Sequence, residues 1–139
     1  MLPWKPTFSI GVEEIDAQHR TLFERVARLE AAIEAREPSP RLQELFTYLE
    51  DYARAHFAAE EQLMRDADYP GLTEHVQEHS EFKRRLRSLV PQWESEGDST
   101  AMLFALGGLL RSWLADHVTS SDQRIGDFLR GRAPSWDRA

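Results

Sequence analysis

Apolar residues recur every three or four positions through most of this chain, which is the spacing of one face of an α-helix. Leu22, Val26 and Leu29 show the pattern in the first stretch. The four stretches that carry it are residues 17–36, 40–66, 71–91 and 99–118. Short polar turns join them, and no strand pattern interrupts them. The sequence therefore predicts an all-α protein, an antiparallel up-down-up-down four-helix bundle.

The segments outside these stretches complete the expected architecture. Residues 1–15 contain two prolines and a glycine and are predicted to form an irregular N-terminal arm. Asp16 is a favourable N-cap for the first helix, and Pro40 suits the first turn of the second helix. A further short helix is expected at residues 122–130. With this length, residues 1–139 are expected to form a single domain.

Composition and charge exclude several classes of protein. The chain has no cysteine, which removes disulfides, thiolate zinc sites and cysteine nucleophiles. Its formal net charge of −7 disfavours binding to phosphate backbones or anionic lipid. No apolar run reaches the length of a transmembrane helix, and the first residues lack the apolar stretch of a secretory signal. We therefore expect a cytoplasmic protein that binds neither nucleic acid nor a membrane.

All the histidines of the chain lie on the apolar stripes. They are His19, His56, His75, His79 and His117. A single inward histidine is more often a core residue with a hydrogen-bond partner than a metal ligand. In an up-down-up-down bundle, however, all five lie at the same end, because they sit near the starts of the first and third helices and the ends of the second and fourth. Burying imidazoles without partners costs about 1–3 kcal/mol each. A metal ion would give each ring a partner, so we predict a metal site at this end.

Two carboxylates are spaced to join the histidines. Glu60 follows His56 by four positions, so the two side chains lie on one helix face. Asp122 follows His117 by five positions, which an ideal helix separates by about 140°. Asp122 can therefore reach the histidines only if the helix widens to a π-turn or breaks over residues 118–121. We predict that distortion.

The number of candidate ligands indicates more than one metal ion. Five imidazoles and two carboxylates exceed the ligand set of one tetrahedral zinc and suit two adjacent ions with both carboxylates bridging. The acids Glu61 and Glu78 point about 100° away from the stripes and are expected in solvent. Imidazole with carboxylate fits iron, and zinc, copper or nickel less selectively. Residue types alone leave the metal open.

In this ordered set of residues the sequence resembles the hemerythrins, in particular their single-domain bacterial members. The resemblance covers residues 4 to about 129. It is carried by Trp4, segments 8–12, 15–19 and 56–64, Tyr69 with Pro70, His75 with His79, and segment 113–117 with Asp122. Two features depart from the family pattern: Ile125 stands where an aromatic residue is common, and the Asn common after Leu22 and Phe23 is missing.

The resemblance implies a non-heme diiron site that binds O2 reversibly. The implied iron ligands are His75, His79 and His117 on one ion, His19 and His56 on the other, and Glu60 and Asp122 bridging both. A hydroxide or oxo group would complete the bridge, and the ion with two histidines would keep one coordination place open. The implied role is oxygen storage, delivery or buffering, without an enzymatic reaction.

Phe23, Trp113 and Leu114 are candidates for the wall of an O2 pocket, although each is also a natural core residue. A diiron oxidase or peroxidase and an oxygen- or redox-sensing domain stay open as alternatives. The ligand balance favours a carrier, because oxygen-activating ferritin-like enzymes use four carboxylates and two histidines. Tyr52, one turn before His56, could serve an enzyme, but a core tyrosine bonded to a backbone group is the preferred interpretation. Besides O2, an oxygen-consuming or redox protein is a candidate partner.

Overall fold

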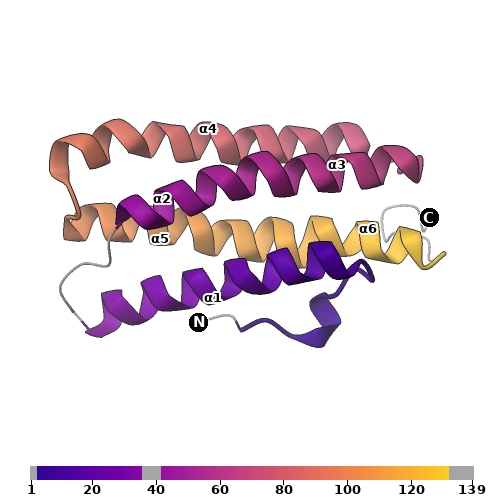
Figure 1. Ribbon diagram of the computed structural model, residues 1–139, viewed down its shortest axis with the longest axis horizontal. Coiled ribbons are helices and arrows are strands. Elements are labelled where there is room, and N and C mark those ends of the chain that lie inside the picture. The colour runs from indigo at the N-terminus through magenta and orange to yellow at the C-terminus, as the bar shows by residue number, and fades with distance from the viewer. Residues whose placement is uncertain (1–2, 36–41, 132–139) are drawn as a thin grey trace.

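The computed structural model describes residues 3–35 and 42–131, and all regular structure within those ranges is helical. Its elements are η1 (Pro6–Phe8), α1 (Glu13–Ala35), α2 (Leu42–Asp51), η2 (Tyr52–His56), α3 (Phe57–Asp66), α4 (Leu72–Glu96), α5 (Thr100–Trp113), η3 (Leu114–Ser121) and α6 (Asp122–Leu129). α2, η2 and α3 form one continuous rod, and α5, η3 and α6 form another. Together with α1 and α4 they make four rods side by side, and successive rods run in opposite directions (Figure 1). The predicted four-helix bundle is confirmed.

Two of the rods contain π-helical segments. η3 includes the residues where a distortion was predicted, and that prediction is confirmed. The side chains of Thr119 and Ser120 donate hydrogen bonds to the carbonyl oxygens of Leu114 (2.9 Å) and Ala115 (3.1 Å). These bonds give partners to carbonyls where the α-helical ladder is interrupted. The second π-segment, η2, was not predicted.

α1 begins at Glu13, earlier than the predicted start at residue 17. Asp16 therefore lies inside the helix, and the expectation that it is the N-cap is wrong. Its carboxylate instead accepts hydrogen bonds from Ser9 Oγ (2.5 Å) and from the N–H of Ile10 (2.8 Å), which fastens the N-terminal arm to α1. The early start follows Gly11, whose φ of 86° turns the chain from the arm into the helix.

The third helix was predicted to end at Pro91 or shortly after it, and α4 continues to Glu96. Pro91 lies within the helix and removes one main-chain hydrogen bond. The last turns are held in place by Trp93, whose ring packs against Phe46 of α2 with 5.1 Å between centroids. Tertiary contact here outweighs the local effect of proline.

The two C-terminal helices expected at 99–118 and 122–130 form a single rod. α6 follows η3 directly, without a turn between them. The π-segment therefore changes the register of the helix without ending it, which is why the short helix is not a separate element. The predicted start of the second helix at Pro40 lies outside the described residues.

The core consists of two apolar clusters separated along the bundle. The larger cluster fills most of the bundle and includes Leu49 and Leu106. The smaller one includes Met64 and Ile125. Along each rod the histidines fall between members of the two clusters. The histidines therefore form a polar layer across the bundle, with apolar side chains on both sides of it.

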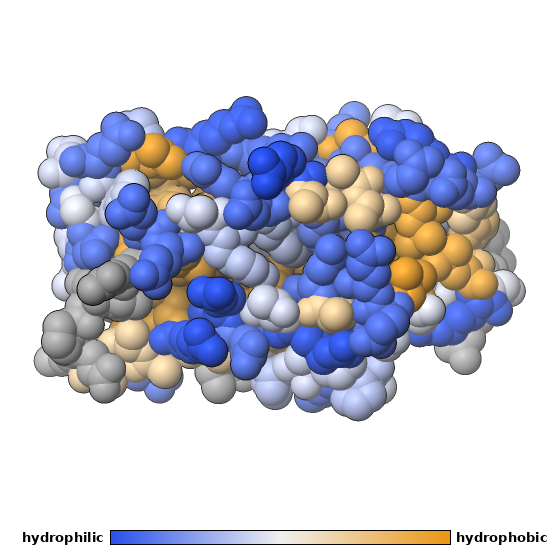
Figure 2. Space-filling model, viewed as in Figure 1, coloured by the Kyte–Doolittle hydropathy of each residue, from blue (hydrophilic) through white to orange (hydrophobic). Residues whose placement is uncertain are grey.

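The outer surface is mainly hydrophilic on the face drawn in Figure 2, with apolar side chains gathered in a few patches. Among the described residues the large hydrophobic side chains left exposed are Phe104 and Leu129. No helix in residues 3–35 or 42–131 is both long and apolar enough to cross a bilayer.

Candidate metal centre

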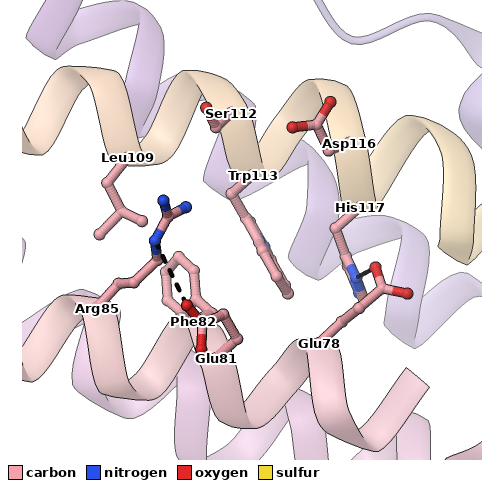
Figure 3. A pocket seen from close by; sticks show the side chains of 9 residues that line it. All are labelled: Glu78, Glu81, Phe82, Arg85, Leu109, Ser112, Trp113, Asp116 and His117. Atoms are coloured by element: carbon pink, nitrogen blue, oxygen red, sulfur yellow. Dashed lines mark hydrogen bonds and ion pairs between the residues drawn. The ribbon is translucent and has the colours of Figure 1, made fainter. Parts of the chain in front are cut away.

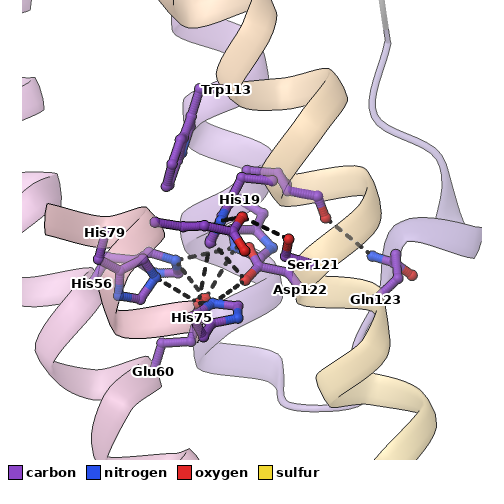
Figure 4. A network of polar contacts seen from close by, with 12 residues as sticks. His19, His56, Glu60, His75, His79, Trp113, Ser121, Asp122 and Gln123 are labelled. Carbon is purple, nitrogen blue, oxygen red and sulfur yellow. Dashed lines mark hydrogen bonds and ion pairs between the residues drawn. The ribbon is translucent and has the colours of Figure 1, made fainter. Parts of the chain in front are cut away.

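The structure brings all the predicted ligand residues into one buried layer (Figure 4). Every rod of the bundle contributes to it. The contributors are His19 from α1, His56 from η2, Glu60 from α3, His75 and His79 from α4, His117 from η3, and Asp122 from α6. All have side chains that are at least 97% buried, so water does not solvate their polar atoms.

The two carboxylates divide the histidines into two groups. Glu60 Oε1 lies 2.6 Å from His75 Nε2 and 3.0 Å from His79 Nε2. Glu60 Oε2 lies 2.9 Å from His56 Nε2. Each oxygen of one carboxylate therefore faces a different set of imidazoles.

Asp122 repeats this arrangement on the other side of the layer. Its Oδ1 lies 2.9 Å from His75 Nε2 and 3.1 Å from His117 Nε2. Its Oδ2 lies 3.0 Å from His19 Nε2. Three imidazoles thus share one oxygen from each carboxylate, and the remaining two share the other oxygens. Two overlapping groups of atoms that could hold a cation follow from this division.

Hydrogen bonding within the described chain does not satisfy this layer. The buried atoms without a hydrogen-bond partner include Glu60 Oε2, both oxygens of Asp122, and His117 Nε2. Ring nitrogens lie near these atoms, but not in bonding directions. His19 Nε2 and His56 Nε2 also face each other at 3.1 Å. Unpaired buried polar atoms cost about 1–3 kcal/mol each, whereas metal ions take lone pairs of this kind. The residues therefore fit a pair of metal ions.

Carboxylates outside the layer fix the orientation of two imidazoles. Glu61 Oε2 lies 2.8 Å from His79 Nδ1, and Glu78 Oε1 lies 2.9 Å from His117 Nδ1. Ser121 Oγ also donates to Glu78, at 2.7 Å. Since a carboxylate accepts, each Nδ1 carries the proton and each Nε2 presents its lone pair to the layer. Glu61 and Glu78 were expected in solvent. Their side chains are 17% and 38% exposed, so the expectation missed their bonds to the imidazoles and not their contact with water.

A third imidazole is oriented by a residue that the sequence did not single out. Gln18 Oε1 accepts a hydrogen bond from His56 Nδ1. Gln18 precedes His19 in α1, so one turn of that helix supplies both a candidate ligand and the support of another. The only sign of this role in the sequence is that Gln18 is the neighbour of His19, a candidate ligand. It does not reveal which neighbouring rod the amide faces.

Aromatic rings pack against three of the candidate ligands. Trp113 stacks on His117 with 3.8 Å between centroids, and Phe57 stacks on His79 at 3.9 Å. Tyr52 stacks on His56 at 4.7 Å. These rings restrict the orientations of the imidazoles and keep water out of the layer. The contribution of Phe57 was not predicted from the sequence.

The predicted wall residues differ in their relation to the layer. Trp113 contacts it directly, through His117. Phe23 stacks on Phe8 of the N-terminal region, with 5.7 Å between centroids. Leu114 is buried in the larger apolar cluster with Phe23. Among the described residues, Trp113 therefore makes a ring contact with a candidate ligand, whereas Phe23 makes none.

Opposite charges dominate the protonation of the layer. Burial disfavours the ionised form of Glu60, but His56 and the other imidazoles hold the pKa of its carboxyl well below its usual range. The same balance lowers the pKa of Asp122. Burial also opposes protonation of His19 and His75, yet the two carboxylates raise the pKa of each ring to about 9. Protons therefore compete with any cation for this layer.

Two surface pockets reach the layer. One, of about 130 Å³, opens between α4 and α5 and is lined by Phe82, Trp113 and His117 (Figure 3). The other, of about 320 Å³, is lined by His75 and Glu78. Each gives a small molecule an approach to imidazoles of the three-histidine group.

Comparison with known proteins gives a consistent result. Residues 10–129 match the family model described as "Hemerythrin HHE cation binding domain". The chain is 33% identical over 132 residues to a bacteriohemerythrin of Pseudomonas aeruginosa, covering 93% of this chain and 82% of the relative. It is 28% identical over 138 residues to a bacteriohemerythrin of Stenotrophomonas maltophilia, covering 99% and 88%. A myohemerythrin of Riftia pachyptila is 29% identical over 119 residues, covering 86% of each chain.

Proposed function

Because the chain belongs to the hemerythrin family, whose model covers residues 10–129, we propose that it binds O2 reversibly at a pair of iron ions in the buried histidine layer. One observation carries the proposal: each carboxylate turns its two oxygens to different groups of imidazoles. Glu60 directs Oε1 toward the group of His75, His79 and His117 and Oε2 toward the other two histidines. Asp122 directs Oδ1 toward His75 and His117 and Oδ2 toward His19. Two carboxylates that bridge two adjacent cations need this arrangement.

The proposed ligands divide unequally between the two ions. The first ion would take His75, His79 and His117, and the second would take His19 and His56. Both would share Glu60 and Asp122. The second ion therefore has fewer protein ligands and is the proposed site of O2 binding. A pair of ferrous ions held by these residues would supply the chemistry of reversible O2 binding.

The surrounding residues support reversible binding rather than oxygen activation. Gln18, Glu61 and Glu78 hold imidazoles in the tautomer that offers Nε2 to the layer. Five neutral imidazoles against two carboxylates give the proposed ions fewer anionic ligands than the oxygen-activating ferritin-like sites have. Buried apolar side chains on both sides exclude water, which limits loss of charged oxygen species. We propose oxygen storage, delivery or buffering as the role.

Anaerobic reconstitution with ferrous salt tests this proposal. We expect two iron ions per chain, and a visible spectrum that changes when air is admitted and returns when oxygen is removed. His56→Ala should lose the second ion first, whereas Gln62→Ala, an exposed position in α3, should bind both. Full iron content in the His56 variant would contradict the ligand assignment. Irreversible oxidation of the iron would contradict reversible O2 binding and favour an oxidase. Consumption of peroxide with an added electron donor would favour a peroxidase.

A further inference from the structure

The most concentrated positive charge in this acidic chain lies on the outer side of α4. Four of the five residues from 83 to 87 are cationic, namely Lys83, Arg84, Arg85 and Arg87. The chain as a whole carries −7. Across a groove of about 540 Å³, Arg54 of η2 faces Lys83 and Arg87. We call this feature the basic groove and define it by Arg54, Lys83 and Arg87. Two acids and three apolar residues complete its lining, namely Glu50, Asp51, Ala53, Leu86 and Val90.

Neighbouring carboxylates neutralise the groove only in part. Asp51 pairs with Arg54 at 2.8 Å, and Glu81 pairs with Arg84 at 2.5 Å. Within the described part of the chain, no ion pair is recorded for Lys83. The same holds for Arg87 among residues 3–35 and 42–131. The groove therefore keeps an excess of positive charge that is exposed to solvent.

One aromatic ring, Phe57, contacts both a residue of the basic groove and a candidate ligand of the histidine layer. The ammonium of Lys83 lies over the ring of Phe57, 5.7 Å from its centroid. The same ring stacks on His79, with 3.9 Å between centroids and an interplanar angle of 3°. Electron tunnelling falls steeply with distance, so a donor seated in the groove would face a short path to a proposed iron ligand.

We propose that the basic groove docks a small acidic electron-carrier protein, one that holds a flavin or a [2Fe–2S] cluster. Only the electron step rests on the proposed iron function. Each reduced carrier would give one electron to one ferric ion and leave oxidised by one electron. Two such transfers would return an oxidised pair of irons to the ferrous state that binds O2. The groove would thus serve to re-reduce the centre after accidental oxidation.

Charge complementarity favours a protein over a nucleic acid as the occupant. Outside this local cluster the chain is strongly acidic, and a long polyanion would be repelled over most of its length. A compact acidic protein can bind the basic groove alone and does not extend over the acidic remainder of the surface. Complementary charges at the edge of an interface mainly raise the association rate and make binding sensitive to salt.

Docking is testable without metal. The metal-free chain would be titrated with an acidic [2Fe–2S] ferredoxin and with an acidic flavodoxin, at low and at high salt. We expect at least one carrier to bind, and Lys83→Glu with Arg87→Glu to weaken that binding by about tenfold or more at low salt. Arg28→Glu, at an exposed position of α1, is the control and should have little effect. Equal weakening by the control, no binding of either carrier, or equal competition by duplex DNA would overturn the proposal.

The electron step is tested on the oxidised, iron-loaded chain. Reduction by the reduced carrier should slow in the Lys83 and Arg87 double variant, whereas reduction by dithionite should not. Phe57→Leu should slow carrier-driven reduction without changing carrier affinity, provided that its iron content matches the wild type. Unchanged carrier-driven rates in the double variant would contradict the proposed route. If the chain bound no iron, the proposed function would fail, and the titrations of the metal-free chain would still decide the docking surface.

Discussion

The indole N–H of Trp113 donates a hydrogen bond to the hydroxyl oxygen of Tyr52 across 3.2 Å. Each ring also stacks on a different candidate ligand, Trp113 on His117 and Tyr52 on His56. His117 belongs to the three-histidine group and His56 to the two-histidine group. This one bond therefore ties together the supports of both groups. The hydroxyl was expected to bond a backbone group, and that expectation is wrong.

Removing this bond should weaken the link between the two metal-binding groups. Tyr52→Phe keeps the stacked ring but leaves the indole N–H buried without a partner, at a cost of about 1–3 kcal/mol in the free energy of unfolding. We also expect the second metal ion to bind less tightly relative to the first. Calorimetric titration of the anaerobic chain with ferrous ions measures both steps.

The Trp113→Phe variant completes a double-mutant cycle for that bond. If the two residues act through the bond, the double variant should lose less stability than the sum of the single variants, with a coupling of about 1 kcal/mol. Additive losses and an unchanged ratio between the two binding steps would show that the rings only fill space.

Glu78 should contribute to metal affinity although it is not a proposed ligand. Its carboxylate accepts from His117 Nδ1 and from Ser121 Oγ. Loss of such an outer partner typically lowers metal affinity about 10–100-fold, so we expect a decrease of that size in Glu78→Ala. Glu74→Ala, one turn earlier and exposed, is the matched control. Competition with a chelator measures both, and equal affinities in the two variants would argue against the role.

The sequence was sufficient where spacing alone decides the structure. Periodicity predicted the bundle, and the five-residue step from His117 to Asp122 predicted η3, because a regular helix could not bring both to one face. No such signal existed for η2. His56 and Glu60 are four residues apart, which suits an ordinary helix.

The supports of the imidazoles could not be predicted in the same way. Whether Glu61 reaches His79, or Gln18 reaches His56, depends on the rotation and height of two neighbouring rods. Helical periodicity places a residue relative to its own helix axis, but it does not give the register between helices to within a hydrogen bond. The misplaced start of α1 has a local cause, since Gly11 allowed the chain to turn earlier than Asp16 suggested.

The stability of the metal-free protein should fall as the pH rises from neutral to alkaline. The pKa values of His19 and His75 are raised from 6.5 to about 9 by Glu60 and Asp122 despite burial. A raised folded-state pKa contributes stability that is fully present below pH 6.5 and is lost as the pH rises through about 9.

Iron loading should remove most of this alkaline dependence, because cations then balance the carboxylates in place of protons. Urea unfolding at pH 6.5 and above pH 9, with and without iron, measures the effect. At low pH the sign reverses: the pKa of Glu60 is lowered, so its contribution is lost as the pH falls below its ordinary range. A metal-free chain that becomes more stable between pH 6.5 and 9 would contradict the assignment of charge in this layer.

The register of η3 can be tested by changing its length by one residue. Deleting Ser120 places Asp122 four positions after His117, and a regular α-helix then separates the two by about 40°. We expect this variant to form an ordinary helix and to keep most of its iron affinity. Inserting one alanine after Thr119 instead makes the step six residues, which turns Asp122 away unless the helix widens further.

The insertion should therefore abolish binding of both ions while leaving the helical circular dichroism nearly unchanged. Each variant changes the rod by a single residue in the same half-buried segment. A difference in iron binding between them therefore reports the direction in which Asp122 points, and not the loss or gain of one side chain. Iron content after anaerobic reconstitution is the measurement. If the deletion lost iron and the insertion kept it, then η3 would not be what brings Asp122 to the histidines.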